Sequence, residues 1–388
     1  MRPAQTRLLL TRRSLLAACA APLWSAAAEP LVVLARLNDF GQIQVPVRLN
    51  GSAPQWFELD SGGGGPLLFI DFAKALELGI QATSTGSSAS PGDGALESDG
   101  RARVSVDLGG LRLEDQEVVI KQKPLGKDGI CALAVLARYV VEFDYETPAV
   151  RLHDAAAFEP RSRGTAIPFT VAGTNPYVDA ALTLPGGGRV AGKFVIDTGA
   201  AGSILYLSHG FVERMGLLDR GLKWAPDSVG LYATRLERFA VGPLSVDSPV
   251  IRRFPARGFG GTAEPDGMIG ADFLRRFRIF FDFRRNQATF APNRHAKDAS
   301  LFDASGIRVE RTARPDLYRI FQVIPGTPAA AAGVRESDLL VAVDGVPVER
   351  LSPLMVQDEL SRDGRTCTLL IEHAQEVRAV TLDLRKIL

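Results

Sequence analysis

The sequence repeats itself at an interval of about 137 residues, and this duplication constrains the fold more than any other feature. Four pairs of short motifs keep nearly the same spacing, and spacing of this regularity indicates two copies of one folding unit. The pairs are Asp60-Ser-Gly62 with Asp197-Thr-Gly199, Leu76-Glu-Leu-Gly79 with Glu213-Arg-Met-Gly216, Asp128-Gly-Ile130 with Asp266-Gly-Met268, and Phe143-Asp-Tyr145 with Phe281-Asp-Phe283. We therefore expect two homologous lobes, at residues 29–160 and 161–298.

Both lobes are expected to be rich in β-strands. Segments such as Val104-Ser-Val-Asp-Leu108 alternate apolar and polar residues with a period of two, which is typical of half-buried strands. The 38 glycines and 24 prolines favour many turns over long helices. The expected fold class is therefore mainly β.

The first 28 residues have the pattern of an export signal. Arg12-Arg13 precede a short apolar run that ends in Ala26-Ala-Ala28, so we expect cleavage before Glu29 and a periplasmic location. Thr11-Arg-Arg-Ser-Leu-Leu16 partly matches a twin-arginine signal. Lipid attachment at Cys19 is a second interpretation, which ranks lower because Ser14–Ala18 alone separate the arginines from the cysteine.

Composition argues against several kinds of partner. A formal net charge of +1 at pH 7 lacks the basic field that nucleic acid requires, so no nucleic-acid partner is expected. Neither the four histidines nor Cys131 and Cys367 have the spacing of metal ligands. We expect no metal and no cofactor. The oligomeric state stays open, with a monomer favoured.

Asp60 and Asp197 each follow an apolar strand and begin a turn of small residues. Taken singly, each is equally an ordinary β-turn aspartate that bonds its own backbone. Two lobes related by a pseudo-two-fold axis would instead bring the two carboxyl groups together. Carboxyl groups in contact share one proton, and such a pair can act as general acid and general base. Ser61 and Thr198 would brace the pair.

The motifs around both aspartates resemble those of the pepsin/retropepsin aspartic proteases. The resemblance rests on Phe194-Val-Ile-Asp-Thr-Gly-Ala200, on Gly267-Met-Ile-Gly-Ala-Asp-Phe-Leu274, and on Asp60-Ser-Gly62 in the first copy. It implies two retropepsin-like β-barrel lobes in a pepsin-like unit. It also implies an aspartic endopeptidase that hydrolyses peptide or protein substrates with water activated between Asp60 and Asp197.

The same resemblance assigns supporting roles to further residues. Gly62 and Gly199 would let the two turns approach closely. Ile269 and Gly270 would pack beneath the Asp197 turn beside the cleft. Tyr232 is a further cleft candidate, with an ordinary half-buried strand aromatic as the alternative.

The first lobe departs from the family pattern at two places. Gly63 stands where the family has Ala, Ser or Thr, and Cys131-Ala132 replaces an apolar residue followed by glycine. A degenerate first lobe would leave a non-catalytic, two-lobed peptide-binding protein, which is the alternative function.

The C-terminal segment, residues 303–388, resembles a bacterial PDZ domain. The resemblance rests on Phe321-Gln-Val-Ile-Pro-Gly-Thr-Pro-Ala-Ala-Ala-Ala-Gly-Val334 and on Asp338-Leu-Leu-Val-Ala-Val-Asp-Gly-Val-Pro-Val348. Ser352-Pro353 is a favourable helix start. PDZ domains bind peptides by strand addition, so the resemblance implies a peptide ligand for tethering or regulation. The carboxylate-binding loop is expected near Ser305-Gly-Ile307, and the alternative is a packing domain without a peptide partner.

Overall fold

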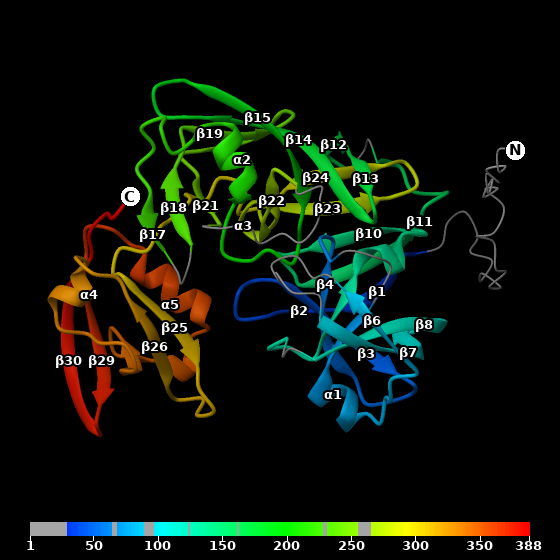
Figure 1. The fold of residues 1–388 in the computed structure, drawn as a ribbon, viewed down its shortest axis with the longest axis horizontal. Coiled ribbons are helices and arrows are strands. Elements are labelled where there is room, and N and C mark those ends of the chain that lie inside the picture. Colours follow the sequence, from blue (N-terminus) through cyan, green and yellow to red (C-terminus); the bar gives the residue numbers. More distant parts are fainter. Residues whose placement is uncertain are drawn as a thin grey trace, which may run out of the picture.

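The computed structural model describes residues 29–63, 68–88, 97–122, 125–160, 163–227, 231–254 and 265–388. The expected export signal, with Cys19, lies outside these residues. The described chain is mainly β and contains four sheets, three in residues 29–298 and one in the C-terminal segment. Figure 1 shows the C-terminal segment as a separate unit beside the other two.

A six-stranded sheet joins the two halves of the duplication, in the order β1-β11-β10-β23-β24-β12. Its strands are β1 (Leu31–Leu34), β10 (Tyr139–Asp144), β11 (Ala149–Asp154), β12 (Thr165–Pro168), β23 (Phe277–Asp282) and β24 (Gln287–Pro292). At its centre Val141 lies opposite Phe281 and Phe143 opposite Ile279. Residues 141 and 143 correspond to 279 and 281 at the 138-residue offset, so this register is symmetric about an axis between β10 and β23.

The first half builds an eight-stranded sheet in the order β2-β3-β4-β9-β5-β8-β7-β6. The strands are β2 (Arg36–Leu37), β3 (Ile43–Leu49), β4 (Gln55–Asp60), β5 (Leu68–Asp71), β6 (Ser84–Ser88), β7 (Glu97–Leu108), β8 (Leu111–Lys121) and β9 (Gly129–Ala132). Helix α1 (Phe72–Glu77) follows β5, and the 3-10 helix η1 (Leu133–Leu136) follows β9.

The second half builds a ten-stranded sheet in the order β17-β18-β21-β16-β22-β15-β14-β19-β20, with β13 paired to β14. The strands are β13 (Thr170–Ala172), β14 (Asn175–Thr183), β15 (Arg189–Ile196), β16 (Leu205–Leu207), β17 (Ala225–Pro226), β18 (Tyr232–Arg235), β19 (Arg238–Val241), β20 (Leu244–Asp247), β21 (Val250–Arg253) and β22 (Gly267–Ile269). Helices α2 (His209–Arg214) and α3 (Ala271–Leu274) follow β16 and β22.

The strand pairings of the two halves correspond. β4 pairs in parallel with β9, as β15 does with β22, while β5 and β16 pair antiparallel to those same partners. The helices correspond too: Asp71 caps α1 and Ser208 caps α2, each by accepting a backbone hydrogen bond. Both helices are followed by a glycine with positive φ, Gly79 at 67° and Gly216 at 59°. The duplication in sequence is thus a duplication in structure.

The C-terminal segment has its own sheet, in the order β25-β26-β27-β29-β30 with β28 paired to β27. Its elements are β25 (Ile307–Arg311), β26 (Tyr318–Val323), α4 (Pro328–Ala331), β27 (Leu339–Val343), β28 (Val346–Pro347), η3 (Val348–Arg350), α5 (Pro353–Leu360), β29 (Thr366–His373) and β30 (Glu376–Asp383). Ser352 caps α5, as the sequence predicts. In Figure 1, α5 and β25 lie on the side of this unit that faces the rest of the chain.

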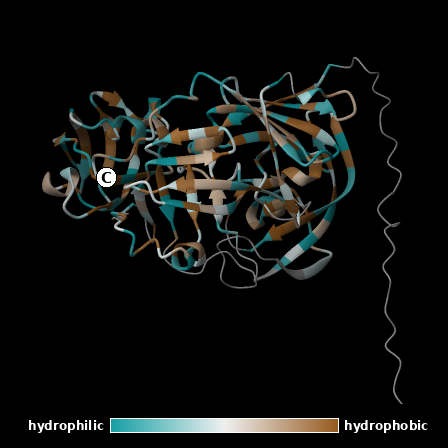
Figure 2. Cartoon of the chain, turned by 90° about the horizontal axis from the view of Figure 1, so that it is seen from above, coloured by the Kyte–Doolittle hydropathy of each residue, from teal (hydrophilic) through white to brown (hydrophobic). Residues whose placement is uncertain are grey.

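Two large apolar cores and two small ones are formed by the described residues. One large cluster of buried side chains runs through both halves of the duplication, and another fills the C-terminal unit. Figure 2 shows hydrophobic and hydrophilic bands alternating along many strands, the pattern of strands with one buried face. No helix among the described residues is long and apolar enough to span a membrane.

Candidate functional site: a paired-carboxyl centre and a PDZ edge strand

Asp60 and Asp197 stand at the ends of two buried strands. β15 begins with alternating burial and ends with three buried residues, Phe194–Ile196, so Asp197 is delivered into the interior. Ile196 is in register with Ile269, and Asp60 is in register with Ala132 on the corresponding strand pair. Rigid strands on both sides therefore fix where the two turns begin.

Ser61 and Thr198 lock the two turns together through four hydrogen bonds that cross between the halves. Each backbone N–H donates to the other residue's hydroxyl oxygen, at 2.9 Å from Ser61 and 3.0 Å from Thr198. Each hydroxyl in turn donates to a carbonyl of the opposite half, Ser61 to Ile196 at 2.6 Å and Thr198 to Leu59 at 2.8 Å. The arrangement is reciprocal, as a two-fold relation requires.

Gly62 and Gly199 lie directly against the carboxyl groups. Each donates its backbone N–H to the aspartate of its own turn, Gly62 to Asp60 at 2.7 Å and Gly199 to Asp197 at 2.8 Å. A Cβ on Gly62 would lie 2.4 Å from the Asp197 Cγ, and a Cβ on Gly199 would lie 2.7 Å from the Asp60 Cγ. Each glycine thus packs on the other half's carboxyl group, and no larger residue fits there.

The two carboxyl groups face each other and share one environment. Burial raises the pKa of both, and the pKa of Asp197 is raised well above its usual range, with the neighbouring charge of Asp60 adding to the effect of burial. The two side chains are hydrogen-bonded to each other, so their titrations are coupled and belong to the pair as a whole. Such a pair holds one proton in a pH range where isolated aspartates are ionised.

The remaining predicted site residues fall into two groups. Ile269 and Gly270 lie beneath the Asp197 turn, where Asp197 N–H donates to the Ile269 carbonyl at 3.0 Å. A Cβ on Gly270 would lie 2.6 Å from the Ala200 carbonyl oxygen, so this position also needs glycine. Tyr232 is half-buried on β18, where the Arg253 guanidinium lies 4.3 Å from the centre of its ring. No hydrogen bond or ring contact among the described residues joins Tyr232 to either aspartate.

The departures of the first half do not disturb the pair. A Cβ on Gly63 would lie 3.2 Å from an Asp60 carboxyl oxygen, which is tight but not excluded. Ala132 keeps the strand register with Asp60, and Cys131 is buried beside it. Burial raises the pKa of the Cys131 thiol to about 12, so this thiol is inert.

Four polar residues near the pair were missed by sequence reasoning. Gln42 donates its side-chain amide to Glu58 at 2.9 Å and also to the Gly199 carbonyl, and the Lys127 ammonium binds Glu58 at 2.6 Å. Burial raises the pKa of Glu58 to about 7. The Tyr145 hydroxyl is buried near Asp197 and Glu58 without a hydrogen-bond partner among the described residues. The sequence feature that could have indicated this polar network is the charged Glu58 between the apolar residues Phe57 and Leu59.

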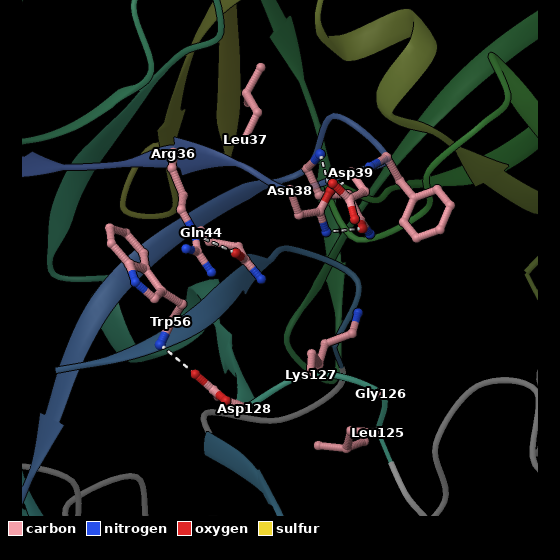
Figure 3. A pocket seen from close by; sticks show the side chains of 12 residues that line it. Arg36, Leu37, Asn38, Asp39, Gln44, Trp56, Leu125, Gly126, Lys127 and Asp128 are labelled. Carbon is pink, nitrogen blue, oxygen red and sulfur yellow. Dashed lines mark hydrogen bonds between the residues drawn. The ribbon is translucent and has the colours of Figure 1, made fainter. Parts of the chain in front are cut away.

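A cavity of about 620 Å³ opens beside this network. Its lining includes Trp56, Lys127 and the Asn38–Gln42 turn, and Figure 3 shows Lys127 pointing toward Asn38 and Asp39 on that turn. The Arg36 guanidinium lies 4.2 Å from the centre of the Trp56 ring and donates to Gln44. Among the described residues, no cluster of His, Cys, Asp and Glu could hold a metal ion.

The C-terminal unit offers an edge strand beside a helix. β25 pairs with β26 alone among the described strands, and α5 lies against it. The loop expected to bind a peptide carboxylate is already filled, because the buried Asp303 carboxylate accepts the Ser305 and Gly306 amides at 3.1 and 2.6 Å. Burial raises the pKa of Asp303 to about 6.

Comparison with known proteins identifies the C-terminal unit. A PDZ domain model matches residues 319–372, which confirms the PDZ prediction. The chain is also 37% identical over 65 residues to a Synechocystis sp. protein named "Putative serine protease HhoA". That match covers 17% of this chain and 13% of the length of the cyanobacterial protein.

The prediction of an aspartic endopeptidase is contradicted by this comparison, because the similar protein is named a serine protease. The aspartic protease part of the predicted resemblance is likewise not supported, since the family match is confined to the PDZ segment. The two Asp-(Ser/Thr)-Gly turns dictate that the carboxyl groups meet, but a local geometry does not by itself fix a reaction or a protease class.

A serine-type centre is not assembled within the described residues either. Three of the four histidine rings hydrogen-bond to acidic side chains instead, with His153 on Glu142, His295 on Asp298 and His373 on Asp338, and the ring of His209 lies 3.1 Å from the Glu213 carboxylate. Among the described residues, no histidine ring hydrogen-bonds to a serine hydroxyl, which a serine nucleophile with a histidine base requires.

Proposed function

We propose that this chain is a peptide-binding protein whose PDZ domain adds an extended peptide to the edge of β25. The observation that carries the proposal is the outer edge of β25, which pairs with no strand of the described part of the chain and lies next to α5. Main-chain groups on a free strand edge bind another chain in extended form, and the neighbouring helix supplies side-chain contacts. Because Asp303 occupies the loop amides, affinity comes from strand addition and not from capture of a terminal carboxylate.

We also propose that Asp60 and Asp197 form a shared-proton pair, supported by Ser61, Gly62, Thr198 and Gly199. The reciprocal hydrogen bonds and the close approach of each glycine to the opposite carboxyl group support this role. The proposal is limited to proton exchange at the pair and includes no protease class.

Three structural expectations complete the proposal. The lobes 29–160 and 161–298 have retropepsin-like folds, as their corresponding strand pairings support, and residues 303–388 form the PDZ domain. Residues 1–28 direct export to the periplasm. The protein works as a monomer without a metal or cofactor.

Fluorescence anisotropy of the full chain with a labelled peptide tests the binding proposal. The probe is an unstructured peptide of alternating valine and threonine, made with a free carboxyl terminus and as its amide. We expect saturable binding with equal affinity for the two forms at pH 7.5. Absence of saturable binding of both would overturn the peptide-binding proposal, and a preference of tenfold or more for the free acid would overturn the filled-loop argument.

Two arginine substitutions on α5 locate the binding site. Gln357 reaches toward Arg308 of β25, so Gln357→Arg places a bulky cation between helix and strand and should weaken binding at least tenfold. Met355 is 49% exposed on the same helix, and Met355→Arg is the matched control that leaves binding unchanged. Equal weakening by both variants would place the peptide elsewhere.

A further inference from the structure

The PDZ edge strand is connected to the turn after Asp197 by two separate chains of polar contacts. One chain starts at Arg311, at the end of β25, and the other at Arg308, near its beginning. Both end on carbonyl groups of the turn Gly199–Gly202, which also carries the N–H that binds the Asp197 carboxylate. The contacts that leave β25 join residues 272 and 81 positions apart in the sequence, Arg311 with Asp39 and Arg308 with Asp227.

The first chain passes through the Asn38–Gln42 turn. Arg311 binds both carboxylate oxygens of Asp39, one at 2.7 Å, and the Leu354 N–H of α5 donates to the Asp39 carbonyl at 3.2 Å. Gln42, on the same turn, donates to the Gly199 carbonyl. The PDZ domain therefore binds one end of the Asn38–Gln42 turn, and the other end of that turn contacts the turn that follows Asp197.

The Asn38–Gln42 turn is stiff enough to transmit a displacement. The Asn38 side-chain oxygen accepts the Phe40 and Gln42 amides, each at 3.0 Å, and its amide group donates to the Gln42 side chain at 2.7 Å. The backbone closes with Gly41 N–H donating to the Asn38 carbonyl at 3.0 Å, and Gly41 has a φ of 80°. A Cβ at Gly41 would lie 3.3 Å from Leu354 of α5, so the turn and the helix are in close contact.

The second chain passes through the buried Asp227. Its carboxylate accepts hydrogen bonds from Arg308 of β25 and from Arg252 of β21 on its two oxygens. Arg252 also donates to the Gly202 carbonyl. Asp227 and Arg308 are both buried, so this chain lies in the interface between the second lobe and the PDZ domain.

We propose that Gln42 and Arg252 are positioning residues for the carboxyl pair, and that the PDZ domain holds both through Arg311 and Arg308. A peptide that adds to β25 meets the strand that carries these two arginines. Peptide binding and the state of the pair are then thermodynamically coupled, and the coupling acts in both directions. The positioning role of Gln42 and Arg252 rests on the proposed pair alone, and only the coupling to peptide binding also rests on the proposed peptide ligand.

Hydrogen exchange of the full chain, resolved at the Gly199 and Gly202 amides, tests the inference without any ligand. Arg311 is partly exposed, so Arg311→Ala should leave the fold intact while loosening the first chain. The exchange rate at Gly199 should rise about two- to fivefold, the range expected for loss of one exposed ion pair. Arg314→Ala is the matched control, because Arg314 pairs locally with Asp316 and should leave Gly199 unchanged.

A second readout separates positioning from general loosening. The Gly199 N–H lowers the pKa of Asp197, so a looser turn should raise the pKa of the pair in Arg311→Ala, and Arg311→Lys should restore it in part. The double variant Asp227→Asn with Arg308→Met removes the ion pair of the second chain of contacts, and with it the ionic partners of the buried Asp303 and of Arg252. Gly202 should then exchange faster.

Three outcomes decide the matter. Faster exchange at Gly199 with a raised pKa of the pair supports the inference, even if the peptide does not bind. Unchanged exchange and pKa in Arg311→Ala and in the double variant overturn it, even if the peptide binds normally. Equal acceleration by Arg311→Ala and Arg314→Ala also overturns it, because the effect is then not routed through Asp39.

Discussion

Replacing Thr198 by valine probes the joint between the two lobes. Valine has nearly the shape of threonine, so the main effect of the change is the loss of one hydroxyl and its hydrogen bonds. That hydroxyl accepts the Ser61 N–H and donates to the Leu59 carbonyl, at 2.9 and 2.8 Å. Both partners lie in the buried joint and belong to the opposite lobe, so the substitution leaves a donor and an acceptor unpaired at once.

The expected loss follows from this count. A buried polar group without a partner costs about 1–3 kcal/mol, so two such groups should lower the free energy of unfolding by about 2–6 kcal/mol. Thr234→Val is the matched control, because the buried Thr234 hydroxyl makes a single hydrogen bond, to the Lys223 carbonyl at 2.9 Å. The control should lose about half as much, roughly 1–3 kcal/mol.

Urea unfolding followed by tryptophan fluorescence measures both variants in the full chain. Beyond the expected export signal, which carries Trp24, the tryptophans are Trp56 and Trp224, one in each lobe, and the PDZ segment contains none, so their signal reports the two lobes. A loss in Thr198→Val no larger than that in Thr234→Val would refute the reasoning, because the hydroxyl would then not join the lobes.

Two further predictions concern the glycines and the filled loop. Gly62→Ala should lower the free energy of unfolding by at least about 2 kcal/mol, because the new methyl group meets the Asp197 carboxyl group. At Gly63 the nearest atom would lie 3.2 Å from the new Cβ, so Gly63→Ala should cost less than about 1 kcal/mol. Equal costs for the two variants would show that the lobes are not in contact at Gly62. Because burial raises the pKa of Asp303 to about 6, this carboxylate is protonated below that pH and becomes a weaker acceptor for the loop amides. The ratio of free-acid to amide peptide affinity should therefore rise between pH 7.5 and pH 5, and a ratio constant across this range would contradict the role of Asp303.

The architecture could be predicted because it depends on patterns that repeat along the chain. The constant offset between Asp60 and Asp197 indicated two matching halves, and strand patterns indicated a mainly β fold. The meeting of both turns follows from the symmetry of the β10–β23 register, which relates residues 143 and 281. The PDZ segment was predictable for a different reason, since its alanine-rich helix and Asp344-Gly345 turn follow one another within a short stretch.

The surroundings of the pair could not be predicted from the sequence. Gln42 and Lys127 bind Glu58 from segments 16 and 69 residues away, and no local sequence pattern predicts hydrogen bonds between side chains so far apart. The role of Asp303 was missed because the sequence of a loop does not show whether one of its own side chains accepts the hydrogen bonds of its backbone amides. The predicted protease class was wrong, since it was inferred from motifs that specify only how two carboxyl groups are held.

The most direct test of this account is the protonation of the pair itself. In the full chain labelled with ¹³C at aspartate carboxyl groups, the account predicts two coupled titration steps for Asp60 and Asp197, the upper one well above the ordinary value of about 3.9. Asp60→Asn should lower that upper step, because the neighbouring charge is removed. Two independent titrations near 3.9, unchanged by Asp60→Asn, would contradict the shared proton and with it the central claim.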